Sequence, residues 1–257
     1  MLLSAHRCGA GARRELENTE TALELALDMD VEYVEFDVQR CGDGTLVLYH
    51  DDVVEIGDRR VPLTDLTFEQ LQAVSSHFLL YEHVLERLSS RKAAHIDLKF
   101  TSPNELYASP ESTYEVAAVR TAIDIVGADN MIVTSLEDRT VKAVRQWAEE
   151  AGYPGLRVGL SLGRGMEGHR RLVVLRTRLS EFFPGPRYRD SMANLVVVNH
   201  RLARMRVASF ARRHRLPMLV WTVDERADLG YWLRPGRAWM VTTNHPAVAV
   251  DVRASLS

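Results

Sequence analysis

The regular alternation of short apolar segments with longer amphipathic ones is the feature that most constrains this fold. The short segments are apolar on both faces, which is typical of parallel strands that are covered by helices. Eight such segments fit the length of one α/β domain of the TIM-barrel type, (β/α)8, in a chain of 257 residues. The predicted strands are residues 2–6, 31–39, 94–100, 131–135, 156–162, 195–199, 217–223 and 238–242.

Helical patterns separate these strands. They lie at residues 21–28, 113–126, 137–150, 168–182, 202–214 and 225–233. The alternative architecture, an open doubly wound sheet, would require a glycine-rich phosphate-binding turn after the first strand. The tetrapeptide Cys8-Gly9-Ala10-Gly11 is a poor version of that turn. We therefore expect one barrel domain over residues 1–257.

The segment after the second strand interrupts the repeat. A turn at residues 41–44 is followed by a predicted strand at 45–50, and this pair resembles a hairpin rather than a barrel repeat. Two further helical patterns lie at residues 67–74 and 80–88. The sequence therefore predicts a short insertion at about residues 51–92, although a crossover connection would give the same pattern.

Charge and cysteine content limit the classes of partner. The net charge is −3, so the chain has no general attraction for nucleic acid or for an anionic membrane, and anion recognition must be local. Cys8 and Cys41 cannot form a disulfide framework and fit the cytoplasm. The amino terminus shows no signal-peptide pattern, and no apolar run approaches the roughly 18 residues of a membrane span. We expect a cytoplasmic protein without a transmembrane segment, with a small-molecule or lipid-derived ligand and no nucleic-acid partner.

Polar side chains gather where the predicted strands end. In a barrel these carboxyl ends carry the active site. Side chains at i and i+2 of a strand point the same way, so Glu35 shares a face with Asp37 and Asp97 shares one with Lys99. The other polar strand ends are His6-Arg7, His50-Asp51, Trp221-Thr222 and Thr242-Thr243-Asn244.

The carboxylates Glu35, Asp37 and Asp97 are candidate metal ligands. An E-x-D pair on a strand is most often a solvated edge, but the strand here is central and hydrophobic. Burying unpaired carboxylates is costly, and a divalent cation is the simplest compensation. An all-oxygen site favours Mg²⁺ or Ca²⁺ over zinc.

Two basic side chains and two histidines complete the predicted site. Lys99 could merely neutralise the acids, or it could hold a phosphate oxygen together with Arg7. Taken singly, His6 and His50 could be ordinary strand-end histidines. As a pair around a carboxylate cluster they suit general acid and base catalysis on a phosphate ester.

An arginine-rich stretch lies between the predicted fifth and sixth strands. A solvated helix face is one interpretation, and a basic rim that recognises a second phosphate or a lipid headgroup is the other. Peripheral contact with an acyl or prenyl chain is conceivable there because apolar residues share the stretch. The arginines are Arg157, Arg164, Arg170, Arg171, Arg176, Arg178, Arg187 and Arg189, the acids are Glu167, Glu181 and Asp190, and the apolar residues are Leu172, Val173, Leu175, Leu179, Phe182 and Phe183.

The motifs and their order resemble those of the glycerophosphodiester phosphodiesterases. They are A-H-R at residues 5–7, E-N-T at 17–19, E-F-D at 35–37, D-G-T-L-V-L-Y-H-D at 43–51, D-L-K at 97–99, V-W-T-V at 220–223 and V-T-T-N-H-P at 241–246. This resemblance spans nearly the whole chain and implies a metal-dependent barrel enzyme that releases glycerol 3-phosphate and an alcohol. It implies divalent-metal ligands at Glu35, Asp37 and Asp97, an acid/base pair at His6 and His50, a phosphate site at Arg7, Glu17 and Lys99, and substrate contact at Trp221.

Several positions depart from the family pattern. The chain has Cys8 where H-R-G is usual, Leu16 where proline usually precedes the E-N-T glutamate, Asp97 in place of glutamate, and Asn244 where T-D-x-P is usual. None of these removes a catalytic group, but together they leave the substrate open. The alternatives are a lysophospholipase D-like or cyclising activity on a lipid or prenyl phosphate, and a barrel that binds a phosphorylated ligand without catalysis. The presence of both His6 and His50 argues against the last.

Overall fold

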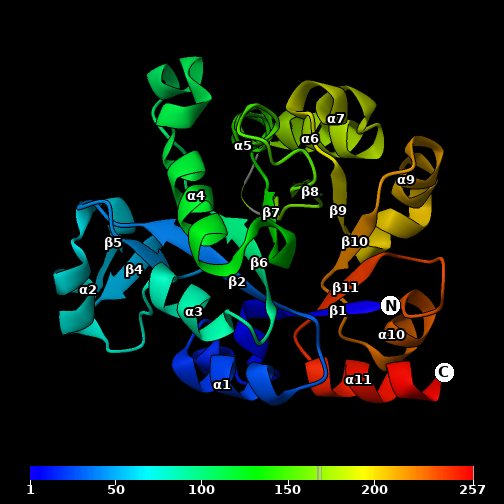
Figure 1. Ribbon diagram of the computed structural model, residues 1–257, viewed down its shortest axis with the longest axis horizontal. Helices are drawn as coiled ribbons and strands as arrows, with labels where there is room; N and C mark the ends of the chain where they lie inside the picture. The colour runs from blue at the N-terminus through cyan, green and yellow to red at the C-terminus, as the bar shows by residue number, and fades with distance from the viewer. Residues whose placement is uncertain (167, 169, 257) are drawn as a thin grey trace.

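Eight parallel strands close into a barrel in the computed structural model, which describes residues 1–166, 168 and 170–256 (Figure 1). The first strand pairs with both the second and the last, so the predicted (β/α)8 architecture is confirmed. In order around the barrel, the strands are β1 (Leu2–Ala5), β2 (Tyr33–Arg40), β6 (Ala93–Leu98), β7 (Met131–Ser135), β8 (Arg157–Leu162), β9 (Leu195–Asn199), β10 (Met218–Trp221) and β11 (Met240–Thr243). Glu167 of the arginine-rich stretch lies outside the described residues.

Helices surround the strands, and most of them begin near the predicted residues. Thr19 caps the first of them by accepting a hydrogen bond from the backbone N–H of Ala22. The helices around the barrel are α1 (Glu20–Asp28), α3 (Tyr81–Leu88), α4 (Tyr114–Val126), α5 (Asp138–Glu150), α6 (Arg171–Phe182), α7 (Gly185–Ser191), α8 (His200–Leu202), α9 (Ala208–His214), α10 (Arg226–Trp232) and α11 (Pro246–Ser255). A π-helical segment, Ala203–Val207, joins α8 to α9. Helices α7 and α11 were not predicted, although each has a proline in its first turn.

The excursion after β2 is built as predicted at its start. Strand β3 (Leu46–Leu48) pairs antiparallel with the end of β2. It is followed by a hairpin of β4 (Val53–Ile56) and β5 (Arg59–Pro62), which was not predicted, and by α2 (Phe68–Val74). The hairpin escapes detection because its exposed charged side chains break the apolar alternation. A small core of Cys41, Val47, Val54, Leu63, Leu66 and Leu71 holds the excursion together.

Strand register decides which side chains meet inside the barrel. Val34, Phe36 and Val38 are buried in the main core between strands and helices, so the alternate residues of β2 face the interior. Asp37 is the register partner of Asp97 on β6, which in turn is the partner of Thr134 on β7. The interior holds a separate apolar cluster of Tyr33, Ile132, Leu195, Val197, Leu219 and Met240. The carboxyl ends of the strands are therefore left for the charged side chains of the predicted site.

Candidate active site

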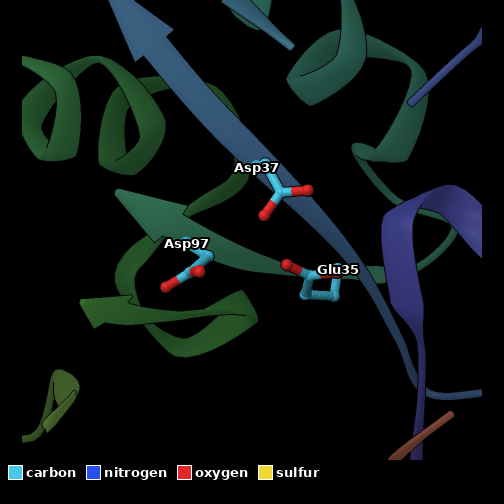
Figure 2. A group of neighbouring side chains, drawn as sticks. All are labelled: Glu35, Asp37 and Asp97. Atoms are coloured by element: carbon cyan, nitrogen blue, oxygen red, sulfur yellow. The ribbon is translucent and has the colours of Figure 1, made fainter. Parts of the chain in front are cut away.

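Three carboxylates converge at the carboxyl end of the barrel (Figure 2). Glu35 and Asp37 come from β2 and Asp97 comes from β6, and one oxygen of each lies within 4.8 Å of the others. Glu35 is only 3% exposed and Asp37 is fully buried. Burial, followed by repulsion from Asp37 and Asp97, raises the pKa of Glu35 well above its ordinary value. This donor set fits a hard divalent cation, because such an ion would remove the repulsion and prefers oxygen ligands.

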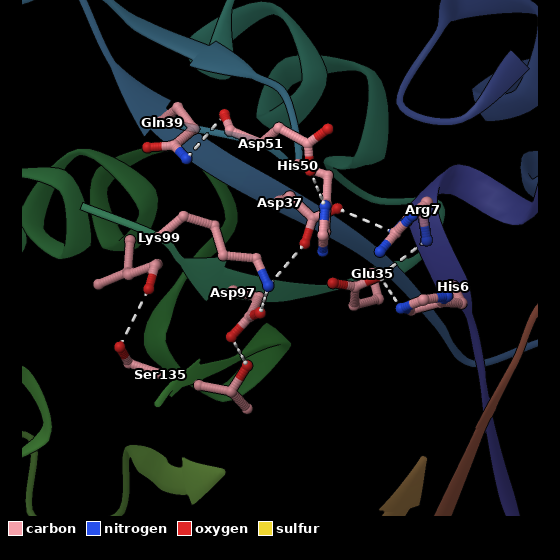
Figure 3. Close-up of polar contacts among 12 residues, drawn as sticks. His6, Arg7, Glu35, Asp37, Gln39, His50, Asp51, Asp97, Lys99 and Ser135 are labelled. Atoms are coloured by element: carbon pink, nitrogen blue, oxygen red, sulfur yellow. Dashed lines mark hydrogen bonds and ion pairs between the residues drawn. The ribbon is translucent and has the colours of Figure 1, made fainter. Parts of the chain in front are cut away.

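Two basic side chains partly balance this negative charge. Lys99 Nζ lies 3.1 Å from Asp37 Oδ1 and 2.5 Å from Asp97 Oδ2, and Arg7 Nε lies 3.3 Å from Asp37 Oδ2. Burial alone would raise the pKa of Asp37, but Lys99 and Arg7 outweigh burial and lower it. Burial would likewise lower the pKa of Lys99, but Asp97 and Asp37 raise it. Lys99 and Arg7 therefore stay positively charged beside the carboxylates (Figure 3). A phosphate bound at the carboxylates would meet both positive charges.

The loop after β1 takes an uncommon backbone conformation to reach this cluster. Arg7 and Cys8 have positive φ angles of 48° and 61°, which few non-glycine residues adopt. This turn lets the Arg7 N–H donate to Glu35 Oε2 at 2.7 Å while the guanidinium pairs with Glu17 at 2.5 Å. Asn18, also at positive φ, donates from Nδ2 to Asp37 Oδ2 at 3.0 Å. The loop thus holds two of the three acids from the side.

His6 is held by a chain of polar groups from the opposite edge of the cluster. Its Nδ1 lies 2.7 Å from Asn244 Oδ1, and its Nε2 lies 3.8 Å from Glu35 Oε2. Asn244 is fixed in turn by Asp224, which accepts hydrogen bonds from the Asn244 side-chain amide at 2.8 Å and backbone N–H at 2.9 Å. Burial, and then the charge of Arg7, lowers the pKa of His6. The imidazole is therefore neutral near neutral pH.

His50 reaches the site from the excursion. The backbone N–H of the preceding Tyr49 donates to the Asp37 carbonyl at 3.1 Å, which places the end of β3 beside the acids. His50 Nδ1 lies 2.6 Å from Asp51 Oδ1, and Gln39 Nε2 donates to the Asp51 carbonyl at 3.0 Å. The His50 side chain is more exposed than that of His6. Two histidines of different exposure thus face the same cluster.

Two cavities meet at these residues. One, of about 420 Å³, occupies the barrel mouth and is lined by the acids Glu35 and Asp97 with Lys99, Arg164 and Trp221. The other, of about 700 Å³, extends toward the excursion and is lined by Glu17, Asn18, Tyr49, His77 and Phe78 among others. Both are lined by His6, Arg7, His50 and Thr222. A diester whose phosphorus lies at this junction would have room for one group on each side.

Within the described chain, two buried donors of the barrel-mouth cavity have neither a hydrogen-bond partner nor a carboxylate within ion-pair distance, unlike the buried Nε of Arg7 beside Asp37. They are the indole N–H of Trp221 and the hydroxyl of Thr242. A buried donor without a partner costs free energy, so both groups are suited to bind a polar ligand. Trp221 was predicted to contact substrate, and it lines this cavity; the contact itself stays a prediction.

The structure brings together every residue that the sequence singled out for the site. Their roles stay predictions, because position alone does not test chemistry. Four residues that had been given no role in the site support it as partners of the site residues: Asn18, Thr134, Asp224 and Asn244. The E-N-T and T-N motifs pointed to the two asparagines, whereas nothing local marked Thr134, which donates to Asp97 at 2.7 Å. His95, which is two residues before Asp97 on β6, is buried and forms hydrogen bonds with Ser4 and Thr134.

Comparison with known proteins places the chain among phosphodiesterases. Residues 6–248 match a family model described as the glycerophosphoryl diester phosphodiesterase family. A Bacillus subtilis protein named "Putative glycerophosphodiester phosphodiesterase YhdW" is 27% identical over 242 residues, which is 88% of this chain and 87% of that protein. Two solved structures share the fold. A glycerophosphodiester phosphodiesterase from Thermotoga maritima has a TM-score of 0.70 at 18% identity, covering 98% of both chains. An Oleispira antarctica phosphodiesterase in complex with the product sn-glycerol-3-phosphate has a TM-score of 0.70 at 16% identity, covering 98% of this chain and 97% of that one.

Proposed function

Because the chain belongs to the glycerophosphoryl diester phosphodiesterase family, we propose that it hydrolyses a glycerophosphodiester to glycerol 3-phosphate and an alcohol, with a divalent cation and two histidines. The observation that carries this proposal is the convergence of three buried carboxylates with His6 and His50 around one junction of two cavities. The product bound by the Oleispira antarctica enzyme supports glycerol 3-phosphate as the product here.

Glu35, Asp37 and Asp97 would hold the cation, either Mg²⁺ or Ca²⁺. Bound there, the cation would polarise the phosphate and offset negative charge that develops on its oxygens. The side chains of Arg7 and Lys99 stabilise the same negative charge, since both are positively charged and lie beside Asp37. Glu17 holds the Arg7 guanidinium in place for this contact.

The two histidines move the protons. His6 is neutral, so its Nε2 accepts the proton of the attacking oxygen. His50 gives a proton to the leaving alcohol, at the edge where the larger cavity opens. The donors of Trp221 and Thr242 hold the polar group that stays in the barrel mouth.

A second candidate is a lysophospholipase D-like or cyclising activity on a lipid. The apolar lining of the barrel-mouth cavity, which includes Leu136, Val197, Leu219 and Trp221, favours it. We also propose a cytoplasmic location, which is supported by the two buried free cysteines, Cys8 and Cys41.

Turnover of glycerophosphodiesters with and without chelator tests the main proposal. We expect chelation to abolish turnover and either Mg²⁺ or Ca²⁺ to restore it, since three converging carboxylates repel one another without a cation. Asp37→Asn should behave like the chelated enzyme. Full turnover in excess chelator, with no metal found on analysis of the protein, would contradict the proposed metal site.

A further inference from the structure

Helix α6 turns its apolar side to solvent. Leu172, Leu175, Leu179 and Phe183 follow one another at helical spacing along one face, and they are 76%, 55%, 51% and 51% exposed. A surface helix normally buries such a face against the core. The one fully buried residue of α6 is instead a carboxylate, Glu181.

The contacts of Glu181 account for this orientation of α6. Its carboxylate accepts hydrogen bonds from the backbone N–H groups of Gly163 at 2.7 Å and Arg164 at 3.2 Å, and it pairs with Arg178 at 2.8 Å. Arg164 lines the barrel-mouth cavity. The polar side of α6 is therefore tied to the loop at the mouth, and this attachment leaves the apolar side exposed to solvent.

Basic residues surround the exposed apolar face. Exposed arginines lie at the start and in the middle of α6, on the π-helical segment and on α9: Arg170, Arg171, Arg176, Arg206 and Arg213. Across the described part of the chain, none of these five forms an ion pair with a carboxylate. Met205, which precedes Arg206 in the sequence, is a further exposed apolar residue at 67%.

A cavity of about 350 Å³ lies at the carboxyl end of α6. Three aromatic side chains line it, Phe182, Phe183 and Phe210, together with Arg206 and Arg213. Its lining contains no carboxylate. The Arg206 guanidinium lies over the Phe183 ring, 4.4 Å from its centroid, so an apolar wall and a positive charge meet in one pocket.

We propose that this surface, comprising the exposed face of α6, its flanking arginines and the adjoining cavity, docks the protein on a membrane of anionic phospholipid. The leucines and Phe183 enter the interfacial layer, and the arginines contact lipid phosphates, one of which occupies the cavity beside Arg206 and Arg213. Charge complementarity selects this partner over a second copy of the chain, because two such basic faces would repel each other. No helix in the described residues is long and apolar enough to cross a membrane, so the contact is peripheral.

Vesicle flotation of the full chain tests this proposal. We expect binding to vesicles of phosphatidylcholine mixed with phosphatidylglycerol, weaker binding to phosphatidylcholine alone, and loss of binding as salt is raised. Arg206→Gln with Arg213→Gln should weaken binding to the mixed vesicles by about 25-fold, at about fivefold for each arginine. Leu175→Ser with Leu179→Ser should weaken it by about tenfold or more.

A matched control uses two exposed arginines elsewhere. Arg59→Gln with Arg60→Gln on β5 removes the same charge and should leave vesicle binding unchanged. All these variants should turn over a soluble glycerophosphodiester at the wild-type rate, so the result is independent of the proposed chemistry. Equal binding to both kinds of vesicle, or undiminished binding of the α6 variants, would overturn the proposal. A concentration-dependent dimer that Leu175→Ser with Leu179→Ser dissociates would also overturn it, in favour of a second copy.

Discussion

Replacing Glu35 by glutamine separates two effects of the carboxylate cluster: its cost to the stability of the metal-free protein and its predicted binding of a cation. Glutamine keeps the shape of the side chain and can still accept the 2.7 Å hydrogen bond from the Arg7 N–H. It removes the negative charge that a cation requires and that Asp37 and Asp97 oppose. We therefore expect Glu35→Gln to stabilise the metal-free protein and at the same time to abolish its response to cations.

The size of the effect follows from the geometry. Two unit charges 4.8 Å apart repel by about 3.5 kcal/mol at an effective dielectric constant of about 20. Lys99 and Arg7 neutralise much of the charge of Asp37, so we expect a net gain of about 2–3 kcal/mol in the free energy of unfolding. For a chain of this length that gain raises Tm by roughly 5–10 °C.

The pH dependence has a definite sign. The folded-state pKa of Glu35 lies above its ordinary value of 4.5, so the folded protein holds a proton there that the unfolded chain releases. The contribution of Glu35 to the free energy of unfolding of the wild type is fully present below pH 4.5, and it is lost as the pH rises through the folded-state pKa. The advantage of Glu35→Gln should therefore vanish in acid and grow with pH, by at most about 1.4 kcal/mol for each pH unit.

Thermal unfolding in chelator and in excess Mg²⁺ or Ca²⁺ measures both effects. Wild type should gain stability from the cation, by about 2.7 kcal/mol at a concentration of 100 Kd, whereas Glu35→Gln should gain none. Glu55→Gln, an exposed glutamate on β4, is the control and should change neither value. A lower Tm for Glu35→Gln in chelator, or a full cation response in that variant, would refute the reasoning.

Two further predictions concern the chemistry. His6→Ala and His50→Ala should each lose on the order of 10² to 10⁴ in kcat while keeping the circular dichroism of the wild type, and normal turnover by His50→Ala would exclude its role in proton transfer. If the hydroxyl next to the ester attacks phosphorus first, an analogue lacking it should bind but be cleaved far more slowly, and phosphorus NMR should detect a cyclic phosphate; normal cleavage of that analogue would assign the attack to water.

The barrel could be predicted because its strands carry their own signal. Strands buried on both faces are apolar throughout, and predicted residues 131–135 and 195–199 coincide with β7 and β9. The β4–β5 hairpin could not be found this way, since Arg59 and Arg60 are exposed and Val54 is the one buried residue of its two strands. Helix α7 was not predicted because its seven residues, which include a glycine, a proline and three charged side chains, show no apolar period.

The site could be predicted only where alternate residues of one strand point to the same side. Alternation put Glu35 and Asp37 on one face of their strand, and the expected site at the carboxyl ends of the strands added Asp97. Register places Asp37 beside Asp97. Contacts between distant segments carry no such signal. Asp224 and Thr134 act through partners on other strands, so only the closed barrel shows what they touch.

The contacts of Asn244 in the closed barrel show what this residue does where the family pattern usually has aspartate. The Asn244 amide donates from Nδ2 to Asp224, so its Oδ1 must face His6 and can only accept a hydrogen bond. His6 therefore carries its proton on Nδ1 and presents the lone pair of Nε2 toward the cluster. An aspartate at residue 244 would impose the same tautomer but would also favour the imidazolium. Asn244 stands between His6 and the Asp224 carboxylate, so His6 is oriented by a neutral group and stays uncharged. A proton acceptor requires this neutral state before attack.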